Sequence, residues 1–289
     1  MKFAVVGGDR RSALLAELLL RDGHRVRSFA LEKAPLPAEI PKDSCLQAAV
    51  YGADGVILPV PTEKGPLLNT PLSSRTLSLE ELWENLWPEQ WLFGGAFSEE
   101  SAAKALRGKQ ILCDLLRRPG FVTGNAALTA EAAVGLLIRE SEGSVRGSRC
   151  LLLGFGRIGK LLAQKLAGLG ALVSVMARKR ADRALAEALG YTPVEPEQLE
   201  GQIGDFDLIV NTIPARVLSD AALCCTSPDG LLLELASPPG GFDRELAKNI
   251  GLRAIAAPGL PGQYSPLAAA QLMRREIDAA LEEGKETLL

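Results

Sequence analysis

Three glycines, Gly154, Gly156 and Gly159, stand in the run LLLGFGRIGK at residues 151–160 with the spacing G-x-G-x-x-G. An apolar stretch at 150–153 precedes them, a helical pattern follows at 159–169, and a second apolar stretch ends at 177. In such a βαβ unit the first glycine permits a tight turn, the second lets the backbone approach a pyrophosphate, and the third packs helix against strand. The helix N-terminus then faces the anion. We therefore predict a dinucleotide site, the alternative being a purely structural glycine turn.

Three cations, Arg178, Lys179 and Arg180, follow the second strand of this unit. An acidic side chain at this place accepts hydrogen bonds from the ribose 2′-OH of NAD, whereas cations suit the 2′-phosphate of NADP. Arg178 is the best candidate because its planar guanidinium matches a phosphate, and Lys179 is the second. The sequence predicts NADP as cofactor, and a solvated basic turn is the alternative interpretation.

Few side chains offer acid–base chemistry. The single histidine, His24, falls in a predicted turn between helix and strand, and we interpret it as structural. Arg118 could clamp a substrate carboxylate, although Arg117 and Arg118 fit a solvated pair equally well. No hydrolase, zinc-protease or P-loop motif occurs, and no catalytic residue is assigned. The remaining candidates are Thr62 and Lys64 near the N-terminal loops and Glu131 in a linking helix.

Loops rich in proline and glycine follow several predicted strands, and such loops carry ligands in parallel sheets. For any one of them, the view that prolines merely end a strand is equally good, but together they favour a site. Thr62 and Gly95, in the first two loops, are candidate substrate contacts. The loops are residues 59–65, 94–98, 211–217, 236–243 and 257–266.

Residues 3–30 align with residues 150–177 without a gap, and Gly7 falls on Gly154. In the first copy Asp9 and Ser12 replace the second and third glycines. An acid beside the turn would repel a pyrophosphate. We therefore predict that the N-terminal copy keeps the fold without the nucleotide site and holds the other reactant.

The elements that must position these residues form two domains, which suits a chain of 289 residues. The predicted fold class is α/β, with two Rossmann-like doubly wound parallel-sheet domains joined by linking helices and a ligand cleft between the domains. Residues 1–126 form the substrate or partner domain, and residues 127–265 form the NADP-binding domain with a linking helix at 128–142. A terminal helix within 266–289 is predicted to pack back on the first domain. Further strands are expected at 56–60, 91–93, 111–115, 208–212, 231–235 and 253–256, and helices at 78–86 and 99–106.

Composition excludes several classes of partner. A net charge of −3 provides no basic excess for nucleic acid, and 47% hydrophobic residues suit a globular core. The longest apolar stretch, residues 126–138, falls short of the roughly 18 to 20 residues of a membrane span. The first residues resemble a strand more than a signal peptide, so a cytoplasmic location is expected. Five cysteines without a C-x-x-C pair predict neither a metal site nor disulfides, only reduced and buried thiols.

Several motifs resemble the family of the dipicolinate synthase A-subunit, in order and with similar spacing over nearly the whole chain. NTIP, LASPPGG and APGLPG are far more specific than the glycine fingerprint alone. The resembling segments are VVGGDRR, VILPVP, RRPGFVTGN, LLGFGRIGK, NTIPARVL, LELASPPGGFD and APGLPGQYSP.

The resemblance implies an NADP-dependent oxidation of a CH–CH group, from dihydrodipicolinate to dipicolinate. It also implies a partner, the flavoprotein-like B-subunit of dipicolinate synthase, and a place in the mother-cell cytoplasm during sporulation, and a homo-oligomer stays open. By motif, the implied pyrophosphate contacts are Gly154, Gly156, Arg157, Ile158 and Gly159. Arg178 would hold the 2′-phosphate, Thr212, Ile213, Pro214 and Ser237 would border the nicotinamide, and Arg118 and Asn125 would face the first domain's ligand.

This chemistry suits a chain without a spare histidine. Loss of a hydride and a proton from a dihydropyridine gives an aromatic ring, so a strong base is less necessary. The remaining tasks are placing the ring and neutralising two carboxylates. The alternatives are another NADP-linked two-domain dehydrogenase of the 2-hydroxyacid or alanine type, or a non-catalytic NADP-binding subunit. Whether the substrate is the dihydro or the hydroxy-tetrahydro compound stays open.

Overall fold

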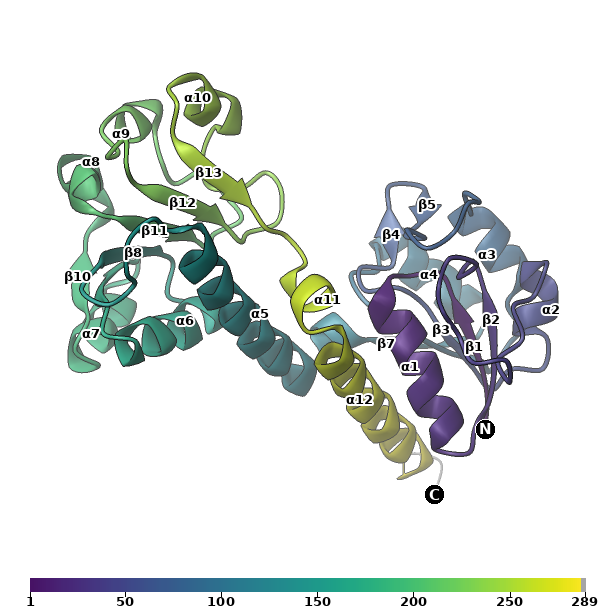
Figure 1. Ribbon diagram of the computed structural model, residues 1–289. Coiled ribbons are helices and arrows are strands. Elements are labelled where there is room, and N and C mark those ends of the chain that lie inside the picture. The colour runs from purple at the N-terminus through teal and green to yellow at the C-terminus, as the bar shows by residue number, and fades with distance from the viewer. Residues whose placement is uncertain (287–289) are drawn as a thin grey trace. The chain divides into compact units, whose positions relative to one another are not determined.

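The computed structural model describes residues 1–286 and divides into two compact α/β units (Figure 1). Unit 1 contains Met1–Asn125 and the described residues from Pro261 onward, and unit 2 contains Ala126–Leu260. The boundaries fall inside two helices, α5 (Pro119–Glu140) and α11 (Leu260–Tyr264). Each unit is built around its own parallel sheet, as the sequence predicts.

Unit 1 has a five-stranded parallel sheet in the order β2-β1-β3-β6-β7. Counted within the sheet this is the order 2-1-3-4-5 of doubly wound proteins of the flavodoxin type, in which ligands bind where the order reverses. The strands are β1 (Lys2–Val6), β2 (Arg25–Phe29), β3 (Gly55–Ile57), β6 (Trp91–Gly94) and β7 (Ile111–Asp114), and β4 (Glu63–Lys64) pairs with β5 (Leu67–Leu68) in a small separate ribbon.

Helices cover both faces of this sheet. Ala4 and Val6 point into a buried cluster with Leu82 of α3 and Ala105 of α4. Helix α1 packs along α12, where Figure 1 shows the two side by side, and the last three positions of the predicted terminal helix, 287–289, lie outside the described residues. The helices are α1 (Arg10–Arg21), α2 (Leu46–Val50), α3 (Leu79–Asn85), α4 (Glu99–Arg107), the 3-10 turn η1 (Leu115–Arg117) and α12 (Pro266–Glu286).

Unit 2 has a six-stranded parallel sheet in the order β10-β9-β8-β11-β12-β13. Counted within the sheet this is 3-2-1-4-5-6, the order of Rossmann domains, which bind dinucleotides across the reversal between the first and fourth strands. The strands are β8 (Arg149–Leu153), β9 (Leu172–Met176), β10 (Thr192–Val194), β11 (Leu208–Asn211), β12 (Leu231–Glu234) and β13 (Arg253–Ala256). The helices are α6 (Arg157–Gly168), α7 (Arg180–Ala188), α8 (Leu199–Gln202), α9 (Asp220–Cys224) and α10 (Arg244–Asn249), with 3-10 turns η2 (Pro196–Gln198) and η3 (Ile203–Asp205).

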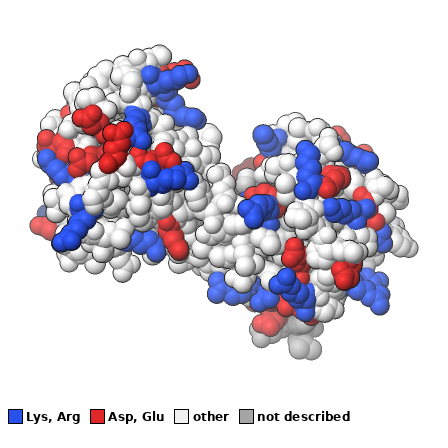
Figure 2. Space-filling view, in the orientation of Figure 1, with Lys and Arg blue, Asp and Glu red and all other residues white. Residues whose placement is uncertain are grey.

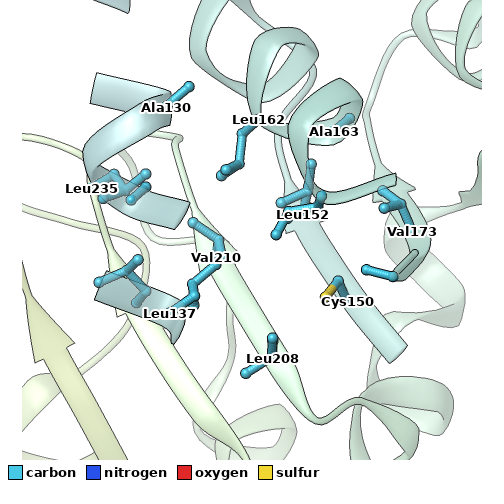
Figure 3. Packing of buried hydrophobic residues seen from close by; sticks show 14 of the residues in the cluster. Ala130, Leu137, Cys150, Leu152, Leu162, Ala163, Val173, Leu208, Val210 and Leu235 are labelled. Atoms are coloured by element: carbon cyan, nitrogen blue, oxygen red, sulfur yellow. The ribbon is translucent and has the colours of Figure 1, made fainter. Parts of the chain in front are cut away.

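Strand residues of unit 2 alternate between two apolar layers, as the two-residue repeat of a strand requires. Cys150 and Leu152 of β8 belong to one buried cluster with Leu137 of α5 and Leu162 of α6, and Figure 3 shows Leu162 next to Leu152. Leu151, on the same strand, joins the opposite layer under α8 to α10. The strands are apolar on both sides because helices cover both faces.

The two copies of the internal repeat have the same secondary structure, residue for residue. A shift of 147 positions carries β1 onto β8, α1 onto α6 and β2 onto β9, and all the boundaries of these six elements coincide. The gapless alignment of residues 3–30 with 150–177 is thereby confirmed as a structural equivalence. The two copies consequently provide a matched comparison of one βαβ unit with two different turns.

Helix α5 corrects one prediction, because it begins at Pro119 and not at residue 128. Proline is favoured in the first turn of a helix, where its missing N–H costs nothing. At Gly120 a Cβ would overlap the side chain of Glu276, and at Gly124 it would come within 2.7 Å of Leu272. The glycines that suggest a break in the sequence therefore serve close packing against α12.

By length and composition alone, α5 could cross a membrane, with a mean hydropathy of 1.5 over 18 residues. That is weak evidence, because core helices pass the same test, and 44% of this window is buried. Ala130, Ala133 and Leu137 pack in the core of unit 2. These contacts make α5 a core helix in this structure.

Charged side chains of both signs are interspersed over the face of the molecule shown in Figure 2. Lys and Arg do not merge into a continuous basic surface on the face in view. This distribution accords with the small net charge of −3. It offers no phosphate-backbone track on that face.

Candidate dinucleotide site

At each of the three glycine positions in the turn between β8 and α6, a different physical reason favours glycine over a residue with a side chain. Gly154 has φ +103°, and a Cβ there would come within 2.6 Å of Thr212 Oγ1. At Gly159 a Cβ would overlap the carbonyl oxygen of Gly154, so the third glycine lets α6 pack onto the turn. Gly156 has φ −77° and no heavy atom within 4 Å of a built Cβ. The second glycine therefore keeps open space that the protein itself does not use.

The N-terminus of α6 is uncapped, whereas that of α1 is closed. Gly156 is the N-cap of α6 and provides no side-chain hydrogen bond. Asp9, at the equivalent position of α1, accepts a hydrogen bond from the Arg11 backbone N–H at 2.9 Å. It also accepts hydrogen bonds from the Arg11 guanidinium, from Nε to both carboxylate oxygens at 3.0 and 3.1 Å and from Nη2 to Oδ2 at 2.8 Å, and Nη2 donates to the carbonyl of Val60 as well. In unit 1 the Asp9 carboxylate therefore occupies the N-terminus of α1, whereas in unit 2 no side chain caps the N-terminus of α6.

Arg178, Lys179 and Arg180 lie directly after β9, on the side of the switch point that receives the adenosine ribose. All three are exposed, and within residues 1–286 none of them forms an ion pair. Arg183 instead fixes this turn, donating to the carbonyls of Ala177 and Arg178 at 2.9 Å. The turn is therefore held by a fourth cation while Arg178 stays available.

Two loops lie on the other side of the switch point, after β11 and β12. Thr212 donates its hydroxyl to the carbonyl of Leu153 at 3.0 Å, which places the first loop against the glycine turn. Ile213 is partly buried beside Gly154, while Pro214 and Ser237 are more open to solvent. The structure thus brings Thr212 and Ile213 together with the glycine turn. Arg157 and Ile158 begin α6, with Arg157 exposed and Ile158 packed on the core.

Sequence reasoning missed two buried polar residues beneath these loops, Asn211 and Glu234. They end β11 and β12, and they are 1% and 4% exposed. The signal was available, because Glu234 is the one acid in the apolar run LLLELA. A carboxylate inside a central strand needs partners, and its partners are the loops themselves.

In unit 1, Thr62 and Gly95 are adjacent, because they belong to two loops at the carboxyl edge of the sheet. The Thr62 hydroxyl donates to the carbonyl of Pro59 at 2.8 Å and accepts from the Gly95 N–H at 3.0 Å. Thr62 is 1% exposed, and its backbone N–H bonds the Gly95 carbonyl at 2.7 Å. This geometry gives Thr62 and Gly95 a structural role in joining the loops, and the predicted substrate contact stays a prediction.

Replacing Thr62 by valine is expected to destabilise unit 1 by about 2 kcal/mol, because the buried Gly95 N–H loses its acceptor. Urea unfolding measures the change. Thr62→Ser keeps the hydroxyl and serves as control, with a smaller cost. A Thr62→Val chain of unchanged stability and raised KM would instead restore the substrate contact that the sequence predicts.

Arg118 is not a free cation in this structure. Its Nε donates to Glu276 at 2.8 Å, and its two terminal nitrogens donate to Glu283 at 2.8 and 2.9 Å. The hydrogen bond to Glu283, followed by that to Glu276, raises the pKa of Arg118 against the effect of burial. The same pairing lowers the pKa of Glu283. Arg118 links α12 to the end of η1, and its predicted role as a carboxylate clamp stays a prediction.

We expect Arg118→Ala to cost about 2 to 3 kcal/mol of stability, because Glu276, 16% exposed, would stay buried without its cation. Arg117→Ala is the matched control, since Arg117 is 78% exposed and 3.8 Å from Asp114, and its loss should stay within about 0.5 kcal/mol. A carboxyl group whose pKa is lowered by folding stabilises the folded state at pH values above its unfolded pKa, and this contribution is lost as the pH falls through its folded pKa. The difference between wild type and Arg118→Ala should therefore shrink as pH falls through the lowered pKa of Glu283. Equal stability of the two arginine variants would contradict the fastening role.

The other candidates are scattered. Lys64 is exposed on β4, Glu131 is exposed on α5 within unit 2, and Asn125 is the last α5 residue of unit 1. His24 lies at the amino edge of the unit 1 sheet, with its ring 5.1 Å from Phe3 and Nδ1 3.3 Å from the Met1 amino group. The structure therefore does not bring His24 near the carboxyl ends of strands, where ligands bind.

Two of the five cysteines are buried and three are exposed, so the expectation that all five are buried is wrong. Cys113 and Cys150 are buried, and desolvation raises the pKa of their thiols to about 11 and about 12. Cys45, Cys224 and Cys225 are exposed. Cys113 and Cys150 are protonated near neutral pH and are poor nucleophiles.

Two family descriptions match the chain. Residues 2–116 match the N-terminal domain of the dipicolinate synthase A-subunit, and residues 125–220 match the NAD-binding domain of D-isomer specific 2-hydroxyacid dehydrogenases. The dipicolinate synthase A-subunit of Bacillus subtilis (strain 168) is 32% identical over 298 residues, covering 99% of each chain.

Solved structures agree with these matches. The A chain of dipicolinate synthase from Bacillus subtilis aligns with a TM-score of 0.85 at 29% identity, covering 99% of this chain and 97% of that one. The dipicolinate synthase A-subunit from Bacillus halodurans gives 0.85 at 25% identity, with 97% of both chains covered. The likeness therefore extends over both units.

Proposed function

The chain belongs to the family of the dipicolinate synthase A-subunit, and from that premise we propose that it oxidises dihydrodipicolinate to dipicolinate with NADP. It is an oxidoreductase with a nicotinamide-cofactor domain and a small-molecule substrate. The proposal also includes the flavoprotein-like B-subunit of dipicolinate synthase, which would be the partner, the mother-cell cytoplasm as location and sporulation as context.

One observation carries the proposal: α6 has an open N-terminus where α1 is closed by Asp9. A Cβ built at Gly156 has no heavy atom within 4 Å, which leaves room for a ligand, and the N–H groups of a first helical turn suit the charge of a pyrophosphate. The repeat makes this a controlled comparison, because the flanking strands and helix have the same lengths in both units. Gly154, Gly156, Arg157, Ile158 and Gly159 are accordingly proposed to hold the pyrophosphate.

The choice of NADP over NAD is supported by the cations after β9. Arg178 and Lys179 are exposed and form no ion pair among the described residues, and no acid follows Met176 in their place. A 2′-phosphate would pair with them, whereas a 2′-OH would meet no acceptor.

The proposed reaction depends more on positioning the substrate ring against the nicotinamide than on acid–base catalysis. The bound nicotinamide supplies a hydride acceptor; the substrate loses a hydride and a proton, giving dipicolinate, NADPH and H⁺. Thr212, Ile213, Pro214 and Ser237 are proposed to border the nicotinamide and to exclude water from the reacting ring face. A dehydrogenase of 2-hydroxy acids would need an acid–base group, and the one histidine of the chain stands at the amino edge of its sheet.

The test is NADPH absorbance, coupled to dipicolinate detection, with freshly prepared dihydrodipicolinate and the purified full chain. The assay is run with and without the purified B-subunit, and with NADP or NAD. We expect turnover with NADP. Tight NADP binding without turnover, even when the B-subunit is present, would favour a non-catalytic NADP-binding role, and turnover of a 2-oxo acid would favour another dehydrogenase.

A further inference from the structure

Glu234 and Asn211 form a buried pair between two adjacent parallel strands. They face each other in register at the ends of β12 and β11. The Asn211 amide Nδ2 donates to Glu234 Oε1 at 2.7 Å. Because both side chains are almost fully buried, water cannot replace either partner.

The Glu234 carboxylate accepts hydrogen bonds with both of its oxygens. Oε1 also accepts from the Ala236 backbone N–H at 3.0 Å, and Oε2 accepts from the Gly241 N–H at 2.7 Å. Within the described part of the chain Glu234 forms no ion pair. A carboxylate is the side chain that accepts with both oxygens, so an amide of the same shape would turn a donor toward one of these donors.

The pair holds two loops at once. Asn211 donates to the Ile213 carbonyl at 2.9 Å and accepts from the Ile213 N–H at 3.1 Å, which fixes the loop after β11. The strap after β12, residues 235–241, returns over the pair, and its Gly241 carbonyl accepts from Val217 and Leu218 at 2.8 and 2.9 Å. A Cβ at Gly241 would overlap the Asn211 amide, so the strap needs glycine to come this close.

Both loops stand at the nicotinamide end of the proposed site. In a sheet of order 3-2-1-4-5-6 the dinucleotide crosses the switch between β8 and β11, with its adenosine ribose at the end of β9. Thr212 to Pro214 and Ser237, on the two loops, are then on the nicotinamide side.

We infer that Glu234 is a positioning residue, whose carboxylate, through Asn211 and the Gly241 N–H, holds the two loops that receive the nicotinamide ring. The inference rests on the proposed function for the identity of the ring. The glycine fingerprint does not include this residue. The nicotinamide half of the site would depend on the buried Glu234 carboxylate, which would act through the loops and not by direct contact with cofactor or substrate.

The experiment compares Glu234→Gln with wild type in the full chain, using NADP⁺ and adenosine 2′,5′-bisphosphate as separate probes in calorimetry. The second probe contains only the adenosine half of the cofactor. We expect the Kd for NADP⁺ to rise about tenfold and the Kd for adenosine 2′,5′-bisphosphate to stay within about twofold. Equal weakening of both probes would indicate general damage to unit 2 and overturn the inference, as would no change in either.

Three further variants make the test more specific. Glu245→Gln, an exposed carboxylate in the first turn of α10, is the matched control and should change neither Kd. The double variant Glu234→Gln with Asn211→Asp restores one donor facing one acceptor and should recover part of the lost NADP⁺ affinity. If Glu234→Gln does not fold, Asn211→Ala, which leaves Glu234 its two backbone donors, should show the same split between the probes, and equal effects on both would overturn the inference.

Failure of the proposed function gives a different pattern. A wild-type chain that binds NAD⁺ in preference to NADP⁺ would refute the NADP assignment. The comparison is then made with NAD⁺ and ADP, and the same split or its absence decides the role of Glu234.

Discussion

Gly156→Val should raise the Kd for the nicotinamide cofactor at least about a hundredfold while the apo chain keeps its stability to within about 1 kcal/mol. The backbone at Gly156 has φ −77°, which any residue adopts, and a Cβ built there has no heavy atom within 4 Å. We therefore expect the valine to take up space proposed for the pyrophosphate. Calorimetry measures the affinity, and urea unfolding of the apo chain measures the stability.

The neighbouring glycines separate this effect from misfolding. Gly159→Ala should lose both affinity and about 2 to 3 kcal/mol of stability, because its Cβ would overlap the Gly154 carbonyl. Gly168→Ala, at the end of the same helix with nothing within 4 Å, should leave affinity unchanged and stability equal or slightly higher. Wild-type affinity in Gly156→Val would mean that the cofactor does not pass over this turn.

Arg178→Asp should reverse the cofactor preference, weakening NADP binding about a hundredfold and leaving NAD binding equal or improved. The substitution removes a cation that suits the 2′-phosphate and introduces the acceptor that suits a ribose 2′-OH. No ion pair of Arg178 exists among residues 1–286, so the change breaks no salt bridge of the fold. The ratio of the two dissociation constants, measured at one fixed salt concentration, is the readout.

Arg180→Asp is the control for a general loss of positive charge. Arg180 is exposed in the first turn of α7, where an acid suits the helix dipole. Its effect on NADP affinity should stay within about threefold. Equal weakening of NADP and NAD in Arg178→Asp would show that Arg178 acts on a part common to both cofactors.

The sequence predicted the cofactor unit well because its signals are local. The alternation of strands and the glycine spacing operate within about 30 residues, and the self-alignment correctly made three elements of unit 1 equivalent to three of unit 2. The predicted bounds were less accurate, since α6 begins at Arg157 and not at residue 159. Pro119, Gly120 and Gly124 misled the prediction of α5, because propensity treats them as breakers whereas tertiary packing against α12 requires the two glycines.

The hydrogen-bond partners of the substrate-side candidates could not be predicted, because they lie outside the local segment. The partners of Arg118, Glu276 and Glu283, are 158 and 165 positions away, so its own segment does not reveal them. The Thr62 hydroxyl is hydrogen-bonded to Pro59 and Gly95, and a single sequence does not reveal this pairing. Glu234 is different, since a single acid within the apolar run LLLELA indicates a buried carboxylate from local sequence alone.

Unit 1 is discontinuous in the chain, and this sets an order of completion during synthesis. Its helix α1 packs on α12, and Arg118 pairs with Glu276, so the N-terminal unit lacks part of its helical layer until α12 has been synthesised. Unit 2 is contiguous from Ala126 to Leu260 and has all its strands earlier. Domains usually mature from the N-terminus onward, whereas in this chain the strands of unit 2 are all synthesised before helix α12 of unit 1.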